Sequence, residues 1–504
     1  MRHYPYLAVL LLSATHALSD ILPIENGSDQ GRVLDACRTI ASQISSSDDV
    51  HYPRKPASSA TVSKLTTLSE YSASLAYVED IHHWSANSTQ ASVCSVRPRT
   101  ADDVSEILSI IGDTRVPFAV KGGGHATNQG FSSTPGVHIA MSAFSEVVYH
   151  ERNQTVEVGA GLIWDQVYAA LEPHGVTVLG GRVSGVGVAG FTLGGGYSWK
   201  SNQHGLTIDT IVAYELVLPT GDIVAVTESS YPDLFFGLKG IVTKFTFNAY
   251  PQTQVFGGFL LYPATSIAAA TAATNKFIAK RTDPLAQVLV EYIVTARLLF
   301  VAATLFYDAP TAPAGTFDDF LSIPAVTRDV KTRSLLSLVK STPVPVEGFR
   351  SLFNHVSVLD HTPALLDLLH DQALFAENIS LNGFVYGFVV EPFLPSYFNN
   401  SKGGAYPHDP DHPLMPLHMT FSWKNPAEDQ AFIDASKAVA KAIFDLAVSE
   451  GQDIDEEKQI QYGNYALADT PLERVYGRNV ERLRGIKREY DPGDVMSLAG
   501  GFRF

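Results

Sequence analysis

The sequence predicts an α+β fold built from two regions of different pattern. Between about residues 115 and 250, short apolar strands alternate with turns and one helix. From about residue 254 to residue 460, alanine- and threonine-rich helices are interspersed with long apolar strands, a pattern typical of an antiparallel sheet with helices. We detect no internal repeat. A chain of 504 residues is long enough for roughly three domains.

Composition excludes two broad classes of protein. With 45% hydrophobic and 17% charged residues, the chain can form large cores, so disorder is not expected. The net charge of -16 is spread along the sequence, and no cluster of Lys and Arg is present that would neutralise phosphates over an extended surface. Nucleic acid is therefore not an expected partner.

The first residues predict a secretory signal peptide over residues 1–19. Arg2 and His3 precede the apolar run 6–12, and small residues follow it. The run is shorter than the roughly 20 residues needed to span a bilayer, so stable membrane insertion is not expected. The predicted localisation is secreted, or the lumen of the secretory pathway.

Sequons and cysteines agree with such a compartment. Five N-x-[ST] sequons predict glycosylation, at Asn26, Asn87, Asn153, Asn378 and Asn399. The only two cysteines are Cys37 and Cys94, and in an oxidising compartment they are expected to form one disulfide. Two free buried thiols are the alternative.

Hydrophobic periodicity places the elements of the first region. Residues 60–80 are predicted to be helical, and residues 101–111 form an amphipathic helix with acidic residues in its first turn. The remaining predictions are strands at 116–120, 137–140, 155–158 and 211–218, a helix at 163–171, and a hairpin turn at 219–222.

The second region is predicted in the same way. Its helices are expected at 266–279 and 427–448, and its strands at 287–294 and 384–390. Two stretches rich in Pro or Gly, 310–313 and 402–413, are predicted to be surface loops and not linkers between domains.

A turn of three glycines, Gly122 to Gly124, directly follows an apolar strand and directly precedes His125. Without Cβ atoms, such a turn can bring successive N–H groups close to an anion, so a pyrophosphate would fit there. The spacing is neither G-x-G-x-x-G nor that of a P-loop. Taken alone, the turn is most simply interpreted as an ordinary loop.

A second stretch, residues 180–198, is also dense in glycine. Glycines weaken strands and helices, so close approach to a large flat ligand is a better explanation for them than a core. The motifs K-G-G-G-H, G-G-R-x-S-G-V-G-V-A-G-F-T-L-G-G-G-Y and His204-Gly205-Leu206-Thr207-Ile208-Asp209 occur in this order. Together they resemble the FAD domain of the vanillyl-alcohol-oxidase (p-cresol-methylhydroxylase) superfamily.

The C-terminus resembles one branch of that superfamily. Residues 461–465 (Q-Y-G-N-Y), 476–483 and 486–494 are similar to the closing segment of berberine-bridge-enzyme-like FAD-linked oxidases of the fungal secreted type. The resemblance implies a two-part FAD-binding domain over 90–253 and an antiparallel-sheet-plus-helices substrate domain over 254–460. It also implies that segments 20–89 and 461–504 pack on the FAD domain.

The resemblance implies FAD attached covalently through His125, whereas the simpler interpretation is an unlinked structural histidine. Relatives with two flavin bonds carry a cysteine where this chain has Val183, so a single link is expected. The implied cofactor-binding residues are His125, Gly122, Gly123, Gly124, Ala126, Thr127, Val183, Ser184, Gly187, Gly190, Gly195, Gly196, Asp209, Ile241 and Asn464. No metal site is expected.

The implied reaction is hydride transfer from a substrate carbon to the flavin, followed by reoxidation by O₂. Tyr465 aligns with the usual base of the family and Tyr462 with a neighbour of the flavin. Because a tyrosine has a pKa near 10, Tyr465 would need a nearby cation or hydrogen-bond donor to act as a phenolate. The candidate partners are Glu391, His418 and Tyr386.

One departure concerns the turn after Gly240. Relatives continue from a strand similar to residues 233–240 through a G-G-x-N-F-G turn into I-V-T-K-F, whereas here Gly240 is followed directly by Ile241. A missing turn could shift the register of the next strand. Either the site tolerates a short loop, or the sequence is mis-spliced, or FAD binding is impaired.

The predicted function is a secreted FAD-linked oxidoreductase that oxidises a small organic substrate. An alcohol or an intermediate of fungal secondary-metabolite biosynthesis is the expected substrate, with O₂ as the second partner. One alternative is an oxidase of carbohydrates or oligosaccharides. Another is a flavin-impaired protein that binds a ligand or guides a cyclisation without net redox chemistry. The sequence does not define the oligomeric state.

Overall fold

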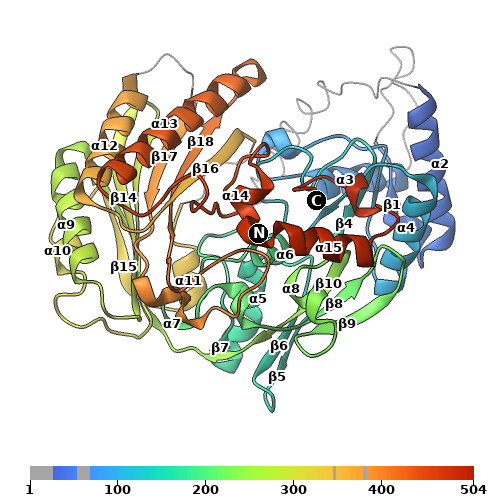
Figure 1. Ribbon diagram of the computed structural model, residues 1–504, viewed down its shortest axis with the longest axis horizontal. Coiled ribbons are helices and arrows are strands. Elements are labelled where there is room, and N and C mark those ends of the chain that lie inside the picture. The colour runs from blue at the N-terminus through green and yellow to red at the C-terminus, as the bar shows by residue number, and fades with distance from the viewer. Residues whose placement is uncertain (1–26, 54–67, 344–347, 379–382) are drawn as a thin grey trace.

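The computed structural model describes residues 27–53, 68–343, 348–378 and 383–504. Figure 1 shows two halves side by side, one containing three smaller sheets and the other a single large sheet with helices on its outer side. The predicted mixture of helices and antiparallel strands is confirmed. The predicted signal peptide lies outside the described residues.

The first half contains three sheets. The four-stranded sheet has the order β1 (Val50–His51), β2 (Cys94–Val96), β4 (Val137–Ala140), β3 (Phe118–Lys121). The five-stranded antiparallel sheet has the order β5 (Val147–His150), β6 (Thr155–Gly159), β10 (Ile241–Asn248), β8 (Ile211–Val217), β9 (Ile223–Thr227). The third sheet pairs β7 (Val176–Thr177) with β11 (Tyr250–Pro251).

Most helices of the first half pack around these sheets. They are α2 (Gly27–Gln43), α3 (Leu68–Ile81), α4 (Ala101–Thr114), α5 (Trp164–Leu171), α6 (Val188–Leu193), α7 (Ser201–His204) and α8 (Pro232–Phe236). Thr100 caps α4, because its side chain accepts a hydrogen bond from the Asp103 N–H while the Asp103 carboxylate binds the Thr100 N–H. The acidic first turn of this predicted helix is therefore a capping box.

The second half is one seven-stranded antiparallel sheet. Its order is β15 (Thr327–Arg333), β12 (Val255–Pro263), β14 (Leu298–Tyr307), β13 (Ala286–Thr295), β17 (Gly383–Val390), β18 (Met415–Trp423), β16 (Arg350–Val358). Four helices lie on its outer side in Figure 1, namely α9 (Ile267–Lys280), α10 (Asp318–Leu321), α12 (Pro363–Asn378) and α13 (Asp429–Ser449). The short α11 (Leu335–Val339) follows β15.

The large sheet has two chemically different faces because side chains alternate along each strand. On β18, Leu417, Met419 and Phe421 belong to the apolar core shared with the helices. His418 and Thr420 lie between them and therefore point to the other face. Leu289 of β13 also points to that face and packs against the core of the first half. The face with the polar residues is therefore turned toward the first half.

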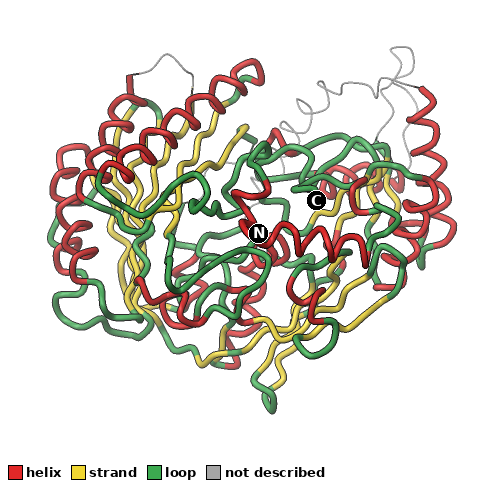
Figure 2. The backbone as a smooth tube through the Cα atoms, viewed as in Figure 1, coloured by secondary structure: helices red, strands yellow, loops and turns green. Residues whose placement is uncertain are grey.

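The C-terminal segment lies on the first half in Figure 1, where it forms α14 (Leu472–Tyr476) and α15 (Val480–Tyr490). Leu483 and Ile486 of α15 join the core of that half, and a Cβ at Gly237 would lie 2.4 Å from the Leu483 side chain. Figure 2 shows loops and turns gathering between the two halves, with most helices at the periphery.

The region before Gly240 differs from the predicted strand, because residues 232–236 form the helix α8. A four-residue link, 237–240, then leads into β10, and Gly240 adopts a φ of 137° that favours glycine. A Cβ there would lie 2.2 Å from the Val217 carbonyl oxygen. Since Ile241 pairs with Val217 and residues 244–248 of β10 also pair with β6, the short link is compatible with the sheet.

The loop 402–413 is not wholly a surface loop, which corrects the prediction. Tyr406 and His408 are buried, and His408 Nε2 lies 2.8 Å from the Asp209 carboxylate of the first half. This contact anchors the loop, and its exposed residues are 402–403 and 409–411.

Cys37 and Cys94 form the predicted disulfide, which connects α2 to β2. Among the sequons, Asn153 and Asn399 are exposed, whereas the Asn87 amide donates to the Thr127 carbonyl oxygen at 2.6 Å and accepts from the Ser351 N–H at 3.0 Å. Glycosylation remains a prediction.

Within the described ranges, no helix combines the length and apolar character needed to cross a membrane.

Candidate active site

The two glycine-rich motifs meet backbone to backbone. Gly123 follows β3, and Gly187 directly precedes α6. A Cβ on Gly123 would lie 2.4 Å from the Gly187 Cα, and a Cβ on Gly187 would lie 2.6 Å from the Gly123 nitrogen. Real Cβ atoms do not approach other atoms so closely, so both positions require glycine.

Not all glycines of the second motif serve a ligand, which corrects part of the prediction. Cβ atoms on Gly180 and Gly181 would lie 2.3 and 2.7 Å from the Trp164 ring, so these two glycines make room for a core tryptophan. By contrast, a Cβ on Gly190 would meet nothing within 4 Å. Gly190 is exposed on α6, and the side chain of Leu193 one turn later is 46% exposed.

The loop between these glycines is fixed by Asp165 of α5. Its carboxylate accepts a 2.5 Å hydrogen bond from the Ser184 hydroxyl and a 2.9 Å bond from the Gly185 N–H. Val183 lies directly before Ser184 and is partly buried. The predicted cofactor-binding residues Val183, Ser184, Gly187 and Gly190 thus follow one another from this loop into α6, with Gly187 buried and Gly190 exposed.

His125 lies in an aromatic cluster that the sequence did not predict. Its ring stacks on Trp84, with centroids 4.7 Å apart and an interplanar angle of 22°. The backbone N–H of Trp84 donates to the Gly124 carbonyl oxygen at 2.9 Å, which connects the segment after α3 to the glycine turn. Burial lowers the pKa of His125 to about 4. The imidazole is therefore neutral, with a lone pair, at physiological pH.

The C-terminal motif supplies three further residues. The Tyr462 hydroxyl accepts hydrogen bonds from the Asn464 amide at 2.8 Å and from the Gly196 N–H at 3.2 Å. The Tyr465 ring stands at 90° to the Tyr462 ring, with centroids 4.9 Å apart. A Cβ on Gly194 would collide with the Asn464 side chain, at 2.3 Å. The motif thus closes over the end of the second glycine-rich stretch.

Tyr465 contacts a buried charged cluster. Arg182 Nη2 lies 2.5 Å from Glu391 Oε2 and donates to the Tyr465 hydroxyl at 3.3 Å. Glu391 Oε1 accepts from His418 Nδ1 at 2.9 Å and from the Tyr465 hydroxyl at 3.4 Å. Arg182 comes from the first half, whereas Glu391 directly follows β17 and His418 lies on β18 of the large sheet.

The charge state of this cluster follows from its surroundings. Burial alone would raise the pKa of Glu391, but the Arg182 guanidinium and His418 lower it to about 2. Burial and the Glu391 charge raise the pKa of Tyr465 well above its ordinary value, against the opposing effect of Arg182. Glu391 is therefore a carboxylate and Tyr465 a neutral phenol at neutral pH.

Several predicted residues make contacts within the protein. The Asp209 carboxylate accepts from the Leu206 N–H at 2.8 Å and the Lys402 N–H at 2.9 Å, in addition to His408. Ile241 is buried at the start of β10. Tyr386 points to the helix side of the large sheet, where it packs on Phe421 and Phe432. Tyr386 is thus not beside Tyr465.

The remaining predicted residues lie near the glycine turns. Thr127 is buried, and its carbonyl oxygen binds Asn87, while Ala126 is partly buried beside His125. Gly195 and Gly196 have φ values of 121° and 87°. Their role in cofactor binding stays a prediction.

Sequence reasoning missed two kinds of site residue. Arg182 lies inside the motif G-G-R-x-S-G. Its position between the glycines was a signal from which it could have been predicted as a site residue. Phe353, His355 and Glu291 carry no local signal, because only the strand register brings them to the polar face of the large sheet. The His355 Nε2 accepts the Tyr462 N–H at 2.8 Å.

Glu291 of β13 places its carboxyl group on the polar face of the large sheet. A Cβ on Gly387 of the neighbouring strand would lie 2.1 Å from Glu291 Oε1, so the glycine makes room for the carboxyl group. Among the described residues, Glu291 has no hydrogen-bond or ion-pair partner. Burial raises the pKa of Glu291 to about 7.

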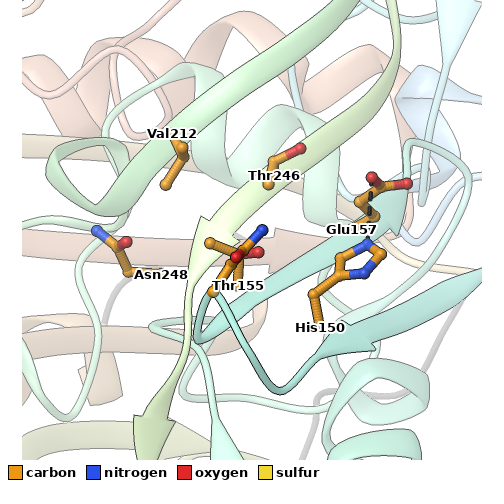
Figure 3. Close-up of a pocket in the computed structure, with 7 residues that line it drawn as sticks. His150, Thr155, Glu157, Val212, Thr246 and Asn248 are labelled. Atoms are coloured by element: carbon orange, nitrogen blue, oxygen red, sulfur yellow. Dashed lines mark ion pairs between the residues drawn. The ribbon is translucent and has the colours of Figure 1, made fainter.

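A separate pocket lies on the five-stranded sheet. Figure 3 shows its lining residues, which include His150, Thr155, Glu157, Val212, Thr246 and Asn248. The His150 and Glu157 side chains form an ion pair at 3.3 Å, and both are partly exposed. Since no predicted cofactor-binding or catalytic residue lines this pocket, it is distinct from the candidate active site.

The residues around α6 fit a large planar cofactor. Gly190 and Leu193 leave an uncovered apolar surface next to the Gly123–Gly187 contact, and His125 adds a neutral nucleophile. Arg182 Nη1 is buried without a hydrogen-bond partner among the described residues, which suits an electronegative ligand atom. A flavin ring has this combination of flat surface and polar edge.

Comparisons with known proteins agree with this geometry. A profile described as FAD binding domain matches residues 93–227, and one described as berberine and berberine like matches residues 461–499. The FAD-dependent monooxygenase drtC of Aspergillus calidoustus is 31% identical, over 84% of each chain. The chain belongs to the berberine-bridge-enzyme-like family of FAD-dependent oxidoreductases. This confirms the resemblance and the enzyme class predicted from the motifs.

Solved structures share the fold. The BBE-like 1 protein of Physcomitrella patens has a TM-score of 0.69 and 19% identity, with 91% of this chain and 97% of that chain covered. Glucooligosaccharide oxidase from Acremonium strictum, described with a 6-S-cysteinyl, 8α-N1-histidyl FAD, has a TM-score of 0.67 and 17% identity, with 82% and 92% covered.

The backbone contact between the glycine motifs yields a prediction about stability. Gly187→Ala should lower the free energy of unfolding by about 1–3 kcal/mol, because the new methyl group must displace the backbone at Gly123. Thermal unfolding measures the effect. The matched control is Gly31→Ala, where a Cβ meets nothing within 4 Å. Equal melting temperatures for the two variants would contradict the contact.

Glu291 yields a prediction about pH dependence. Since burial raises its pKa from 4.5 to about 7, the folded protein favours the protonated form. The resulting stability is complete below the unfolded pKa and is lost as the pH rises through about 7. Glu291→Gln should flatten the fall of the melting temperature across this range, whereas the exposed control Glu151→Gln should not. An unchanged profile in Glu291→Gln would refute the assignment.

Proposed function

We propose that this chain is a secreted oxidase that carries FAD on a single covalent bond to His125 and oxidises a small organic substrate. The substrate class is an alcohol or an intermediate of fungal secondary-metabolite biosynthesis, and O₂ is the final electron acceptor. One observation carries the proposal. The His125 ring lies 6.3 Å from Phe353, which lies 5.7 Å from Tyr465, so the expected flavin anchor and the candidate catalytic cluster share one aromatic wall.

The glycine motifs would hold the cofactor in this proposal. Gly122 to Gly124 would face the pyrophosphate, and the uncovered strip at Gly190 would face the ring system. The neutral imidazole of His125 would supply the nucleophile for the covalent bond. Val183 carries no sulfur, which supports a single link. Secretion rests on the apolar run near the N-terminus and on the sequons.

A bound flavin accepts a hydride from the substrate carbon and passes the electrons to O₂. Tyr465 would touch the substrate hydroxyl, because its own hydroxyl already has a donor in Arg182 and an acceptor in Glu391 and keeps one lone pair. Tyr462 would support this arrangement from the side of Gly196. The charged cluster would thereby orient the hydroxyl for loss of hydride.

A panel of aryl and alkyl alcohols, with oligosaccharides as a separate arm, tests the reaction class. We expect H₂O₂ to form with members of the alcohol panel. Turnover of oligosaccharides alone would favour the carbohydrate oxidase. Incorporation of an oxygen atom from O₂ into the product would replace the oxidase with a monooxygenase, the activity in the name of the Aspergillus relative.

His125→Ala should abolish covalent flavin, because alanine has no nucleophilic nitrogen. After acid precipitation, the wild-type pellet should stay yellow, whereas the variant should release its flavin to the supernatant. His174→Ala replaces an exposed histidine outside the aromatic cluster and should behave as wild type. Flavin that remains attached in His125→Ala would show that the link lies elsewhere.

Tyr465→Phe should reduce substrate-dependent H₂O₂ formation on the order of 100-fold or more, because the substrate loses its hydroxyl partner. The visible flavin spectrum should be retained. Tyr386→Phe removes a hydroxyl from the helix side of the same sheet and should change the rate little. A rate in Tyr465→Phe equal to that of the control would remove Tyr465 from the mechanism.

A further inference from the structure

We propose that Nε2 of His418 is the atom that accepts the proton of the substrate hydroxyl. The inference rests on the proposed oxidase function and assigns its base to a residue other than Tyr465. It follows from the hydrogen bonds within the Arg182–Glu391–His418–Tyr465 cluster, which fix where each proton lies.

The hydrogen bond to Glu391 defines the tautomer of His418. A carboxylate can only accept hydrogen bonds, so the 2.9 Å contact with Glu391 Oε1 requires a proton on His418 Nδ1. In the neutral imidazole, the lone pair then lies on Nε2. In the described part of the chain, this nitrogen has no hydrogen-bond partner, and a tenth of the side chain remains accessible. The Glu391–His418 pair thus has the arrangement of an oriented general base.

The other two groups of the cluster are poor proton acceptors. Tyr465 is a neutral phenol that already donates its proton toward Glu391. Glu391 is held as a carboxylate by Arg182 at 2.5 Å and by the His418 N–H, so protonation would disrupt both contacts.

The position of His418 agrees with this role. Its ring stacks on Tyr465 with centroids 4.3 Å apart and stands edge-on to Phe353 at 6.2 Å. A substrate hydroxyl next to the Tyr465 hydroxyl would therefore lie beside the imidazole, and in this proposal its single proton turns from the Tyr465 lone pair to His418 Nε2 before the hydride leaves. The aromatic wall that contains Phe353 continues to His125, the expected flavin anchor.

Neighbouring titratable groups do not compete for the proton. His355 pairs with His418 across β16 and β18, but burial lowers its pKa to about 3 and its Nε2 accepts the Tyr462 N–H. Glu291 lies beyond Val389, which pairs with both Glu291 and His418. Arg182 reaches His418 only through Glu391.

The step balances in atoms and electrons. The substrate O–H bond breaks and its proton goes to His418 Nε2, while the C–H bond breaks and its electron pair leaves with the hydrogen as a hydride to the flavin. A carbonyl forms. O₂ then takes two electrons and two protons to give H₂O₂, one proton coming from the transferred hydride and the other from His418. The imidazole returns to its neutral state.

The decisive variant is His418→Asn, because the asparagine amide can donate to Glu391 in place of Nδ1–H but offers no base. We expect full covalent flavin and, with the alcohol that turns over, anaerobic flavin reduction slowed on the order of 100-fold. Added imidazole should restore part of the rate. Tyr386→Phe is again the control.

A second measurement needs no substrate. Solid-state NMR of the ¹⁵N-histidine-labelled holoenzyme at mildly alkaline pH should show His418, assigned by its absence from His418→Asn, with a proton on Nδ1 and an unprotonated Nε2. A proton on Nε2 would overturn the proposal.

The two proposals can fail separately. If the wild type holds no flavin or oxidises no member of the panel, the proposed function fails, and the NMR tautomer still decides the state of His418. If the wild type is active and His418→Asn keeps the wild-type rate of flavin reduction, the base assignment fails while the function stands.

Discussion

The candidate active site depends on a buried ion pair between the two halves of the molecule. Arg182 follows the first glycines of the second motif, and Glu391 follows β17 of the large sheet. Both side chains are buried, so removal of either partner would leave an uncompensated charge in a medium of low dielectric constant. The same carboxylate also receives His418 and Tyr465. The same side chains therefore connect the two halves and form the candidate catalytic cluster.

Local chemistry made part of this site predictable. The glycine turn before His125 and the Y-x-N-Y segment have residue types and a spacing that are specific enough to indicate a site. The disulfide could be predicted because the chain has two cysteines. The same reasoning overestimated how many glycines of the second motif contact a ligand. Gly180 and Gly181 looked like ligand contacts, but glycine also makes room for a protein side chain, here Trp164. Sequence alone does not distinguish these two needs.

Long-range register determined what could not be predicted. Trp84 reaches His125 only because the segment after α3 is hydrogen-bonded to the glycine turn. Glu291 and Phe353 reach the site through cross-strand pairing with residues far away in the sequence. The strands of the large sheet are apolar on both faces in many positions, so their alternation is weak in the sequence. The link at Gly240 likewise depended on a backbone conformation that glycine permits.

The two faces of the large sheet separate stability from substrate choice. Leu417, Met419 and Phe421 hold β18 to the helices, whereas His418 and Thr420 of the same strand face the site. A substitution on the inner face can therefore change what is bound without opening a cavity in the core, and the flavin-binding half need not change with it.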